Sequence, residues 1–140
     1  MHRCNGRHVT ETKPDEVDYR ALADFRHALR RFTNFSQKAA EDVGLTPQQH
    51  QAILAIKAED SLTIGELADR LMLRPHSATG LADRLVRLAL VERRGAAGDK
   101  RRTELCITER ADELLKQLSD SHRNELRKMR PLLVGLLESL

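Results

Sequence analysis

Residues 91–108 read VERRGAAGDKRRTELCIT, and this stretch decides the fold. Branched and aliphatic residues near both ends, with glycines between them, predict a β-hairpin. The strand residues that face a core are expected to be Leu90, Val91, Leu105 and Ile107. Five basic residues lie between positions 93 and 102, namely Arg93, Arg94, Lys100, Arg101 and Arg102, and only Glu92 and Asp99 oppose them there. Since crowded like charges favour an oppositely charged partner, the hairpin is predicted to contact a polyanion such as a phosphate backbone.

Two helices are predicted immediately before this hairpin. Thr63 to Glu66 fit a capping box that starts the first helix, and Pro75 starts the second, which is expected to run to about Leu88. The second helix has an apolar stripe of Ala78, Leu81, Leu85 and Leu88. Its other face carries small, hydroxyl and basic residues that suit a major groove: His76, Ser77, Thr79, Gly80, Arg84 and Arg87.

Two helices followed by a basic hairpin make a winged helix-turn-helix, and residues 62–108 resemble the MarR family of bacterial transcription regulators. The resemblance is carried by Leu-x-x-Arg repeats between Leu67 and Leu85, by LVERR at 90–94, and by Asp99-x-Arg101 followed by Leu105-x-Ile107-Thr108. It implies that Arg101 enters the minor groove from the wing tip and that Asp99 orients it. Two positions depart from the family pattern: Ala89 stands where glycine is usual, and Arg74 where a small or acidic helix cap is usual.

The expected fold is mainly α with a small β-hairpin wing: a winged helix-turn-helix with N- and C-terminal dimerisation helices. The expected parts are a polar tail (1–14), an N-terminal dimerisation helix (15–42), a DNA-binding domain (43–108) and C-terminal dimerisation helices (109–140). The first long helix is predicted from about Glu16 to Ala40, a capping box at Thr46 to Gln49 starts another, and Thr108 caps the last long helix. Pro131 is expected to reset the path of the chain.

Six of the last ten residues are leucine or valine, which predicts burial against a second subunit in a two-fold homodimer. Packing within one chain is the alternative. The expected interface residues are Leu22, Phe25, Leu29, Leu118, Leu126, Met129, Leu132, Leu133, Leu136 and Leu137. Such a dimer would bind double-stranded DNA at a pseudo-palindromic operator with half-sites about one helical turn apart, most simply as a repressor.

The resemblance also implies a pocket for a small aromatic or phenolic effector between the dimer helices and the winged domain. The candidates are Tyr19, Phe25, His27 and Phe32, each of which also fits a packing stripe. A thiol-based redox-sensing regulator is an alternative, because Cys4 lies among basic residues and Cys106 lies on a wing strand. Plain reduced thiols are the simpler interpretation, and His2, Cys4 and His8 lack a fourth ligand for a metal.

The composition of the chain argues against several other classes of protein. The 140 residues are 40% hydrophobic and 32% charged, with a net charge of +3. No apolar run approaches the roughly 20 residues that span a bilayer, and the polar start lacks a signal-peptide core, so a cytoplasmic location without membrane contact is expected. Catalytic, cofactor-binding and metal motifs are not apparent, which argues against an enzyme. The main rival is a winged-helix protein-interaction module without sequence-specific DNA binding.

Overall fold

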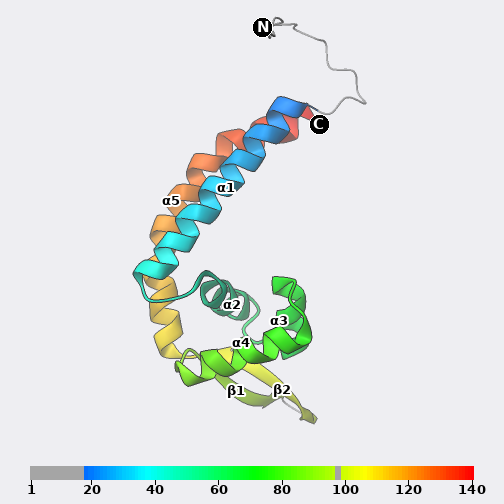
Figure 1. The fold of residues 1–140 in the computed structure, drawn as a ribbon, viewed down its shortest axis with the longest axis vertical. Helices are drawn as coiled ribbons and strands as arrows, with labels where there is room; N and C mark the ends of the chain where they lie inside the picture. The colour runs from blue at the N-terminus through cyan, green and yellow to red at the C-terminus, as the bar shows by residue number, and fades with distance from the viewer. Residues whose placement is uncertain (1–17, 97–98) are drawn as a thin grey trace, which may run out of the picture.

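The computed structural model describes residues 18–96 and 99–140, with the side chains of 96–101 left out. The elements in chain order are α1 (Tyr19–Asp42), α2 (Pro47–Ala58), α3 (Ile64–Leu71), α4 (Pro75–Arg87), β1 (Val91–Ala96), β2 (Asp99–Ile107) and α5 (Glu109–Ser139). Helices α1 and α5 lie side by side as a long arm, and the other elements gather at one end of it (Figure 1). The predicted fold class, mainly α with a small hairpin wing, is confirmed.

Side-chain caps start three of the helices, as predicted from the sequence. The Thr46 hydroxyl accepts from the Gln49 N–H at 3.1 Å, and the Thr63 hydroxyl accepts from the Glu66 N–H at 3.2 Å. In both motifs the third residue of the helix reaches back to the cap N–H. The Thr108 hydroxyl likewise accepts from the Ala111 N–H at 3.2 Å. Each cap satisfies N–H groups that have no partner within the helix, which sets where the helix begins.

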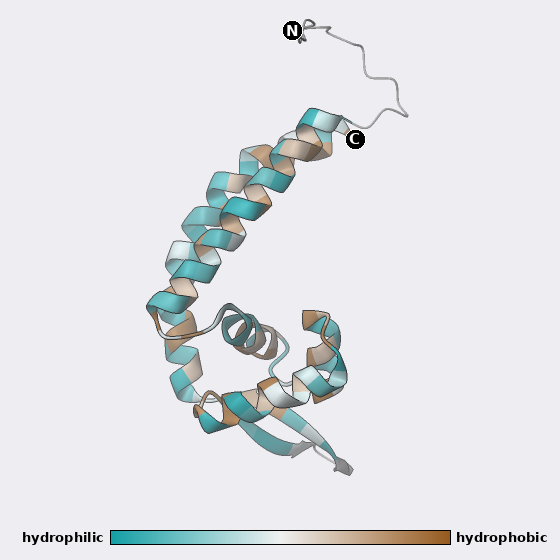
Figure 2. Cartoon of the chain, in the orientation of Figure 1, coloured by the Kyte–Doolittle hydropathy of each residue, from teal (hydrophilic) through white to brown (hydrophobic). Residues whose placement is uncertain are grey.

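One hydrophobic core joins the winged part of the chain, which runs from α2 to β2, to the start of α5. Its largest fully buried side chains come from α2, α3, α4 and the base of the hairpin: Ile53, Ile56, Leu67, Leu81, Leu85, Leu90, Leu105 and Val91. Ala111, Leu115 and Leu118 of α5 belong to the same core. Figure 2 shows brown hydrophobic residues interspersed with teal hydrophilic ones along the short helices and along the arm. The arm and the winged part are therefore joined by packing as well as by the chain.

The hairpin is antiparallel and is anchored at its base. Val91 pairs with Ile107, and Arg93 pairs with Leu105. The Leu62 N–H donates to the Leu105 carbonyl at 3.1 Å, and the Leu105 N–H donates to the Leu62 carbonyl at 2.7 Å. This bridge extends the two-stranded sheet by one residue and fixes β2 beside the segment that leads into α3.

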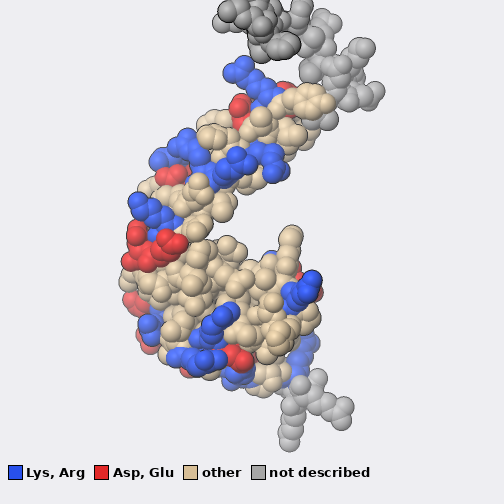
Figure 3. All heavy atoms as spheres, in the orientation of Figure 1, with Lys and Arg blue, Asp and Glu red and all other residues tan. Residues whose placement is uncertain are grey.

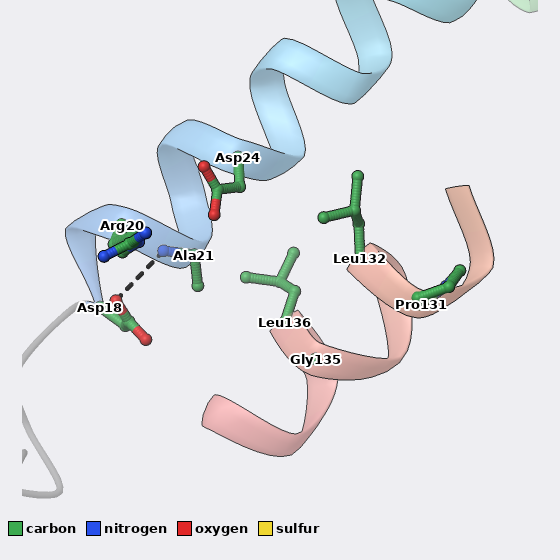
Figure 4. Close-up of a pocket in the computed structure, with 8 residues that line it drawn as sticks. All are labelled: Asp18, Arg20, Ala21, Asp24, Pro131, Leu132, Gly135 and Leu136. Carbon is green, nitrogen blue, oxygen red and sulfur yellow. Dashed lines mark hydrogen bonds between the residues drawn. The ribbon is translucent and has the colours of Figure 1, made fainter. Parts of the chain in front are cut away.

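Helix α5 corrects the expectation that Pro131 resets the chain. The helix is continuous from Glu109 to Ser139, with Pro131 inside it. Proline removes one intrahelical hydrogen bond. The C-terminal turns nevertheless pack against α1, where Leu132 and Leu136 point toward the first turn of the neighbouring helix (Figure 4). The predicted set of C-terminal helices is thus one helix.

The ends of α1 also differ slightly from the prediction. Asp18 caps the helix, its carboxylate accepting from the Ala21 N–H at 3.1 Å, whereas Glu16 lies outside the described residues. The helix continues past Ala40 to Asp42 and ends where Gly44 adopts a φ of +83°, a left-handed conformation that glycine adopts without strain. In the described part of the chain, no helix has the length and apolar character needed to cross a membrane.

Candidate nucleic-acid interface

Helix α4 presents one exposed face beside the hairpin. Ala78, Leu81 and Leu85 are buried, so the helix docks through the predicted apolar stripe, although Leu88 at its end is exposed. The predicted contact residues all lie exposed on the remaining surface: His76, Ser77, Thr79, Gly80, Arg84 and Arg87. No atom lies within 4 Å of the position that a side chain at Gly80 would occupy. The face is therefore open, and it is flat at its centre.

Two details of α4 follow from its sequence. Arg74 occupies the N-cap position and makes no side-chain cap, which leaves the first-turn amides without a side-chain acceptor. The Thr79 hydroxyl donates to the Pro75 carbonyl at 3.0 Å, so its proton is used within the helix. Thr79 can still accept a hydrogen bond from outside.

Three wing arginines are paired with carboxylates. Arg93 of β1 pairs with Asp83 of α4, Arg94 pairs with Glu92 of the same strand at 3.1 Å, and Arg102 of β2 pairs with Glu66 of α3 at 3.0 Å. The expectation that only Glu92 and Asp99 oppose the basic charge of this segment is therefore wrong. Asp83 and Glu66 are distant in sequence and reach the hairpin only through the fold.

Glu66 is the best-held carboxylate of this group. Its Oε1 atom accepts from the Thr63 hydroxyl at 2.9 Å, from the Thr63 N–H at 3.3 Å and from Arg102. Hydrogen bonds from Thr63, and then from Arg102, lower the pKa of Glu66 below its ordinary value. The carboxylate is consequently charged at neutral pH.

Several predicted residues fall outside what the structure describes. The side chains of Asp99, Lys100 and Arg101 at the wing tip are among them, as are His2, Cys4 and His8. Cys106 is described: it is a half-buried free thiol on β2, opposite Glu92.

Positively charged side chains occur over both parts of the molecule. In Figure 3 blue Lys and Arg side chains are scattered, with red carboxylates among them, over the lower region where α4 and the wing lie, and others follow the arm. Within the described residues, Arg84 and Arg87 of α4 form no ion pair, in contrast with Arg93 and Arg102 of the wing. The charges of α4 are thus available to an outside partner.

The predicted dimerisation residues divide into three groups along the arm. Leu22, Leu29, Leu126, Leu132 and Leu137 are exposed. Phe25, Leu133 and Leu136 are half-buried, whereas Leu118 and Met129 are already buried within the chain and offer little surface to a partner. The sequence list missed three further exposed apolar residues of the arm, Tyr19, Val134 and Leu140. The arm therefore carries several apolar side chains that the described residues leave exposed.

A pocket of about 550 Å³ lies where α1, α2 and α5 meet. Phe32 lines it, as predicted for an effector pocket, together with His50, Leu54 and Leu118. His27 and Phe32 border a smaller cavity of about 140 Å³ further along the arm. Tyr19 is 81% exposed near the outer end of the arm, and neither Tyr19 nor Phe25 lines the larger pocket. Most of the lining comes from α2 and from α5, whereas all four candidate residues lie on α1.

The rim of this pocket is charged. Lys57, Lys116 and Arg123 lie on it, and Asp112 pairs with Lys57 at 2.9 Å and with Lys116 at 3.3 Å. Hydrogen bonds from these two lysines lower the pKa of the Asp112 carboxyl. The rim therefore carries three cationic side chains and one carboxylate.

The arrangement of α3, the turn, α4 and the β1–β2 hairpin is that of a winged helix-turn-helix protein. Residues 43–102 match the model of the MarR family.

Relatives agree with this assignment. The chain is 32% identical over 75 residues to the HTH-type transcriptional repressor MdtR of Bacillus subtilis, covering 54% of this chain and 48% of that protein. It is 31% identical over 93 residues to the HTH-type transcriptional regulator YcgE of Bacillus subtilis, covering 66% of this chain and 60% of that protein. The alignments thus span about half of each curated relative.

A solved structure shares the fold. A point mutant of MepR from S. aureus, bound to an oligodeoxyribonucleotide, superposes with a TM-score of 0.63 at 22% identity, covering 89% of this chain and 99% of that chain.

Proposed function

We propose that this protein is a sequence-specific, DNA-binding transcriptional regulator that acts as a homodimer on a pseudo-palindromic operator. The outward face of α4 carries this proposal, since it places small, hydroxyl and arginine side chains together beside a wing. Two relatives named as transcriptional regulators, and a MepR structure with bound oligodeoxyribonucleotide, support it. The name of MdtR favours a repressor.

The geometry of α4 suits a major groove. Ser77 and Gly80 allow close approach of the helix, and Arg84 and Arg87 supply guanidinium groups for guanine edges or phosphates. From the family resemblance, Arg101 is the wing-tip contact in the minor groove and Asp99 its holder. Arg101→Ala should then weaken DNA binding by about 1–3 kcal/mol without unfolding the protein.

The exposed apolar residues of α1 and α5 support the homodimer. A two-fold interface would cover Leu22, Leu126 and Leu137 of both copies at once, because an isologous interface uses the same patch twice. The two copies of α4 would then contact successive half-sites on one side of the duplex.

The pocket near Phe32 is proposed to bind the effector. Its lining is largely apolar, and the cations Lys57, Lys116 and Arg123 on its rim favour an anionic aromatic or phenolic compound. The pocket touches both the arm and α2 of the winged part. A bound ligand is therefore placed to alter how the two α4 helices of a dimer are spaced.

Selection of bound sequences from a random duplex pool, followed by titration at several salt concentrations, tests the proposal. A pseudo-palindrome should be recovered, and log affinity should fall with log salt with a slope of about −0.9 per phosphate contact. A protein-interaction module without sequence-specific DNA binding would recover no sequence. That result would refute the proposal.

A further inference from the structure

We propose that Glu66, acting through Arg102, is a positioning residue that sets the angle of the wing for DNA binding. Arg102 then supports the wing and does not bind phosphate, contrary to its assignment from charge alone. The DNA-binding part of this inference rests on the proposed function.

The wing needs support beyond its base. A two-stranded hairpin is marginally stable by itself in water. Burial of Leu90, Val91 and Leu105 and the backbone bridge to Leu62 hold the base. Toward the tip, Arg102 and Thr103 are exposed, so apolar packing no longer fixes the strand there.

Two polar contacts continue the attachment along β2. The Ser61 hydroxyl donates to Glu104 Oε2 at 3.1 Å, and Arg102 Nη2 donates to Glu66 Oε1 at 3.0 Å. Arg102 lies beside the register shift between Gly95 and Ala96, and the two contacts place its side chain on the same side of β2 as that of Glu104. Both reach the segment from Ser61 to Glu66, which contains the start of α3. The contacts therefore tie successive points of the strand to α3 and to the segment that leads into it.

Glu66 is a suitable anchor because it is itself held in place. Its Oε1 atom also accepts from the Thr63 hydroxyl at 2.9 Å and from the Thr63 N–H at 3.3 Å. A carboxylate near a helix N-terminus is further stabilised by the helix dipole. Arg102 thus binds to a fixed acceptor on α3, not to a freely moving side chain.

The pairing distinguishes Arg102 from a phosphate ligand. If Arg102 bound phosphate, Glu66 would compete for it and repel DNA, so removing the Glu66 charge would tighten binding. If Glu66 positions the wing, removing its charge weakens binding. The two roles predict opposite signs for one substitution.

The variants are Glu66→Gln, Arg102→Gln and the double substitution. Glutamine retains the capping box, since either glutamate or glutamine reaches back to the cap N–H. Amide hydrogen exchange along β2 is measured for each variant. The dissociation constant of each variant is also measured, with the duplex that the unaltered protein selects.

We expect faster exchange in β2 and about two- to fivefold weaker DNA binding for each single variant, the range typical of an exposed ion pair. The double variant should bind no more weakly than either single variant, because both remove one interaction. The salt slope should stay unchanged.

Glu92→Gln is the matched control. It removes the same charge from a pair with Arg94 that lies within β1 and joins no two elements. It should leave β2 exchange unchanged and should not weaken DNA binding.

Unchanged β2 exchange in Glu66→Gln would overturn the inference. So would tighter DNA binding in Glu66→Gln together with a salt slope reduced by about 0.9 in Arg102→Gln. If even the unaltered protein selects no duplex, the proposed function fails, while the exchange measurement still decides whether Glu66 holds the wing.

Discussion

The rings of His50 on α2 and His122 on α5 lie with their centroids 5.1 Å apart. His50 is 5% exposed and is the only buried polar residue in the described part of the chain. The His122 Nδ1 atom contacts the Leu118 carbonyl at 2.8 Å and must donate to it, and Nε2 lies 2.9 Å from the Ser36 hydroxyl of α1. This pair therefore joins the arm to the winged part.

The His50 environment predicts a loss of stability in mild acid. Burial, and then the charge of His122, lower the pKa of His50 below its ordinary value of 6.5. Between the folded and the ordinary pKa the unfolded chain binds more protons. The free energy of unfolding is therefore undiminished above the ordinary pKa of His50, and it falls as the pH drops toward the pKa of His50 in the folded protein. The thermal midpoint, measured from about pH 7.5 to about pH 5.5, should decrease over this window.

In His50→Gln the thermal midpoint should fall less on acidification than in the unaltered protein, whatever the effect of the substitution on the midpoint near neutral pH. The matched control is His27→Gln, which changes an exposed histidine of α1 and should preserve the pH dependence. An equal decrease in His50→Gln and in the unaltered protein would contradict the assignment.

Ala89→Gly should stabilise the protein. Ala89 adopts a φ of +57°, a left-handed conformation that costs a residue with a Cβ atom about 1 kcal/mol or more. Glycine removes this strain but adds freedom to the unfolded chain, so we expect a net gain of about 0.5 kcal/mol in the free energy of unfolding. Chemical denaturation measures it. Ala23→Gly, at an exposed position inside α1, should have the opposite sign.

Arg84→Ala should weaken binding to the selected duplex by about 1–3 kcal/mol, because the guanidinium lies on the open face of α4. The free energy of unfolding should change by no more than about 0.5 kcal/mol. Arg30→Ala removes the same charge from the exposed surface of α1 and serves as the control. Equal weakening by both substitutions would show a general charge effect and not a contact made by α4.

Leu137→Glu should convert the proposed dimer into a monomer. Leu137 is 68% exposed on α5, and a buried carboxylate in an apolar interface without a partner is strongly unfavourable. Sedimentation velocity gives the oligomeric state. Met72→Glu, at an exposed turn far from the arm in sequence, should leave the state unchanged. A Leu137→Glu variant that still sediments as a dimer would place the interface elsewhere.

Much of the local structure was predictable from short patterns. Capping boxes at Thr46 and Thr63, the proline that starts α4 and the alternating strands of the hairpin each depend on neighbours within a few residues. The outward face of α4 followed from helical spacing. The prediction for Pro131 was wrong because a proline signals a break locally, whereas packing against α1 keeps the helix continuous.

The sequence by itself determined the order of elements and the outward face of α4, since both follow from periodicity and local hydrogen bonding. Only the tertiary structure decided which charges remain available: Asp83 of α4 pairs with Arg93, and Glu66 of α3 pairs with Arg102. It likewise decided the His50–His122 contact and the pocket around it. Contacts between residues far apart in the chain depend on how the helices pack, and no local pattern records that.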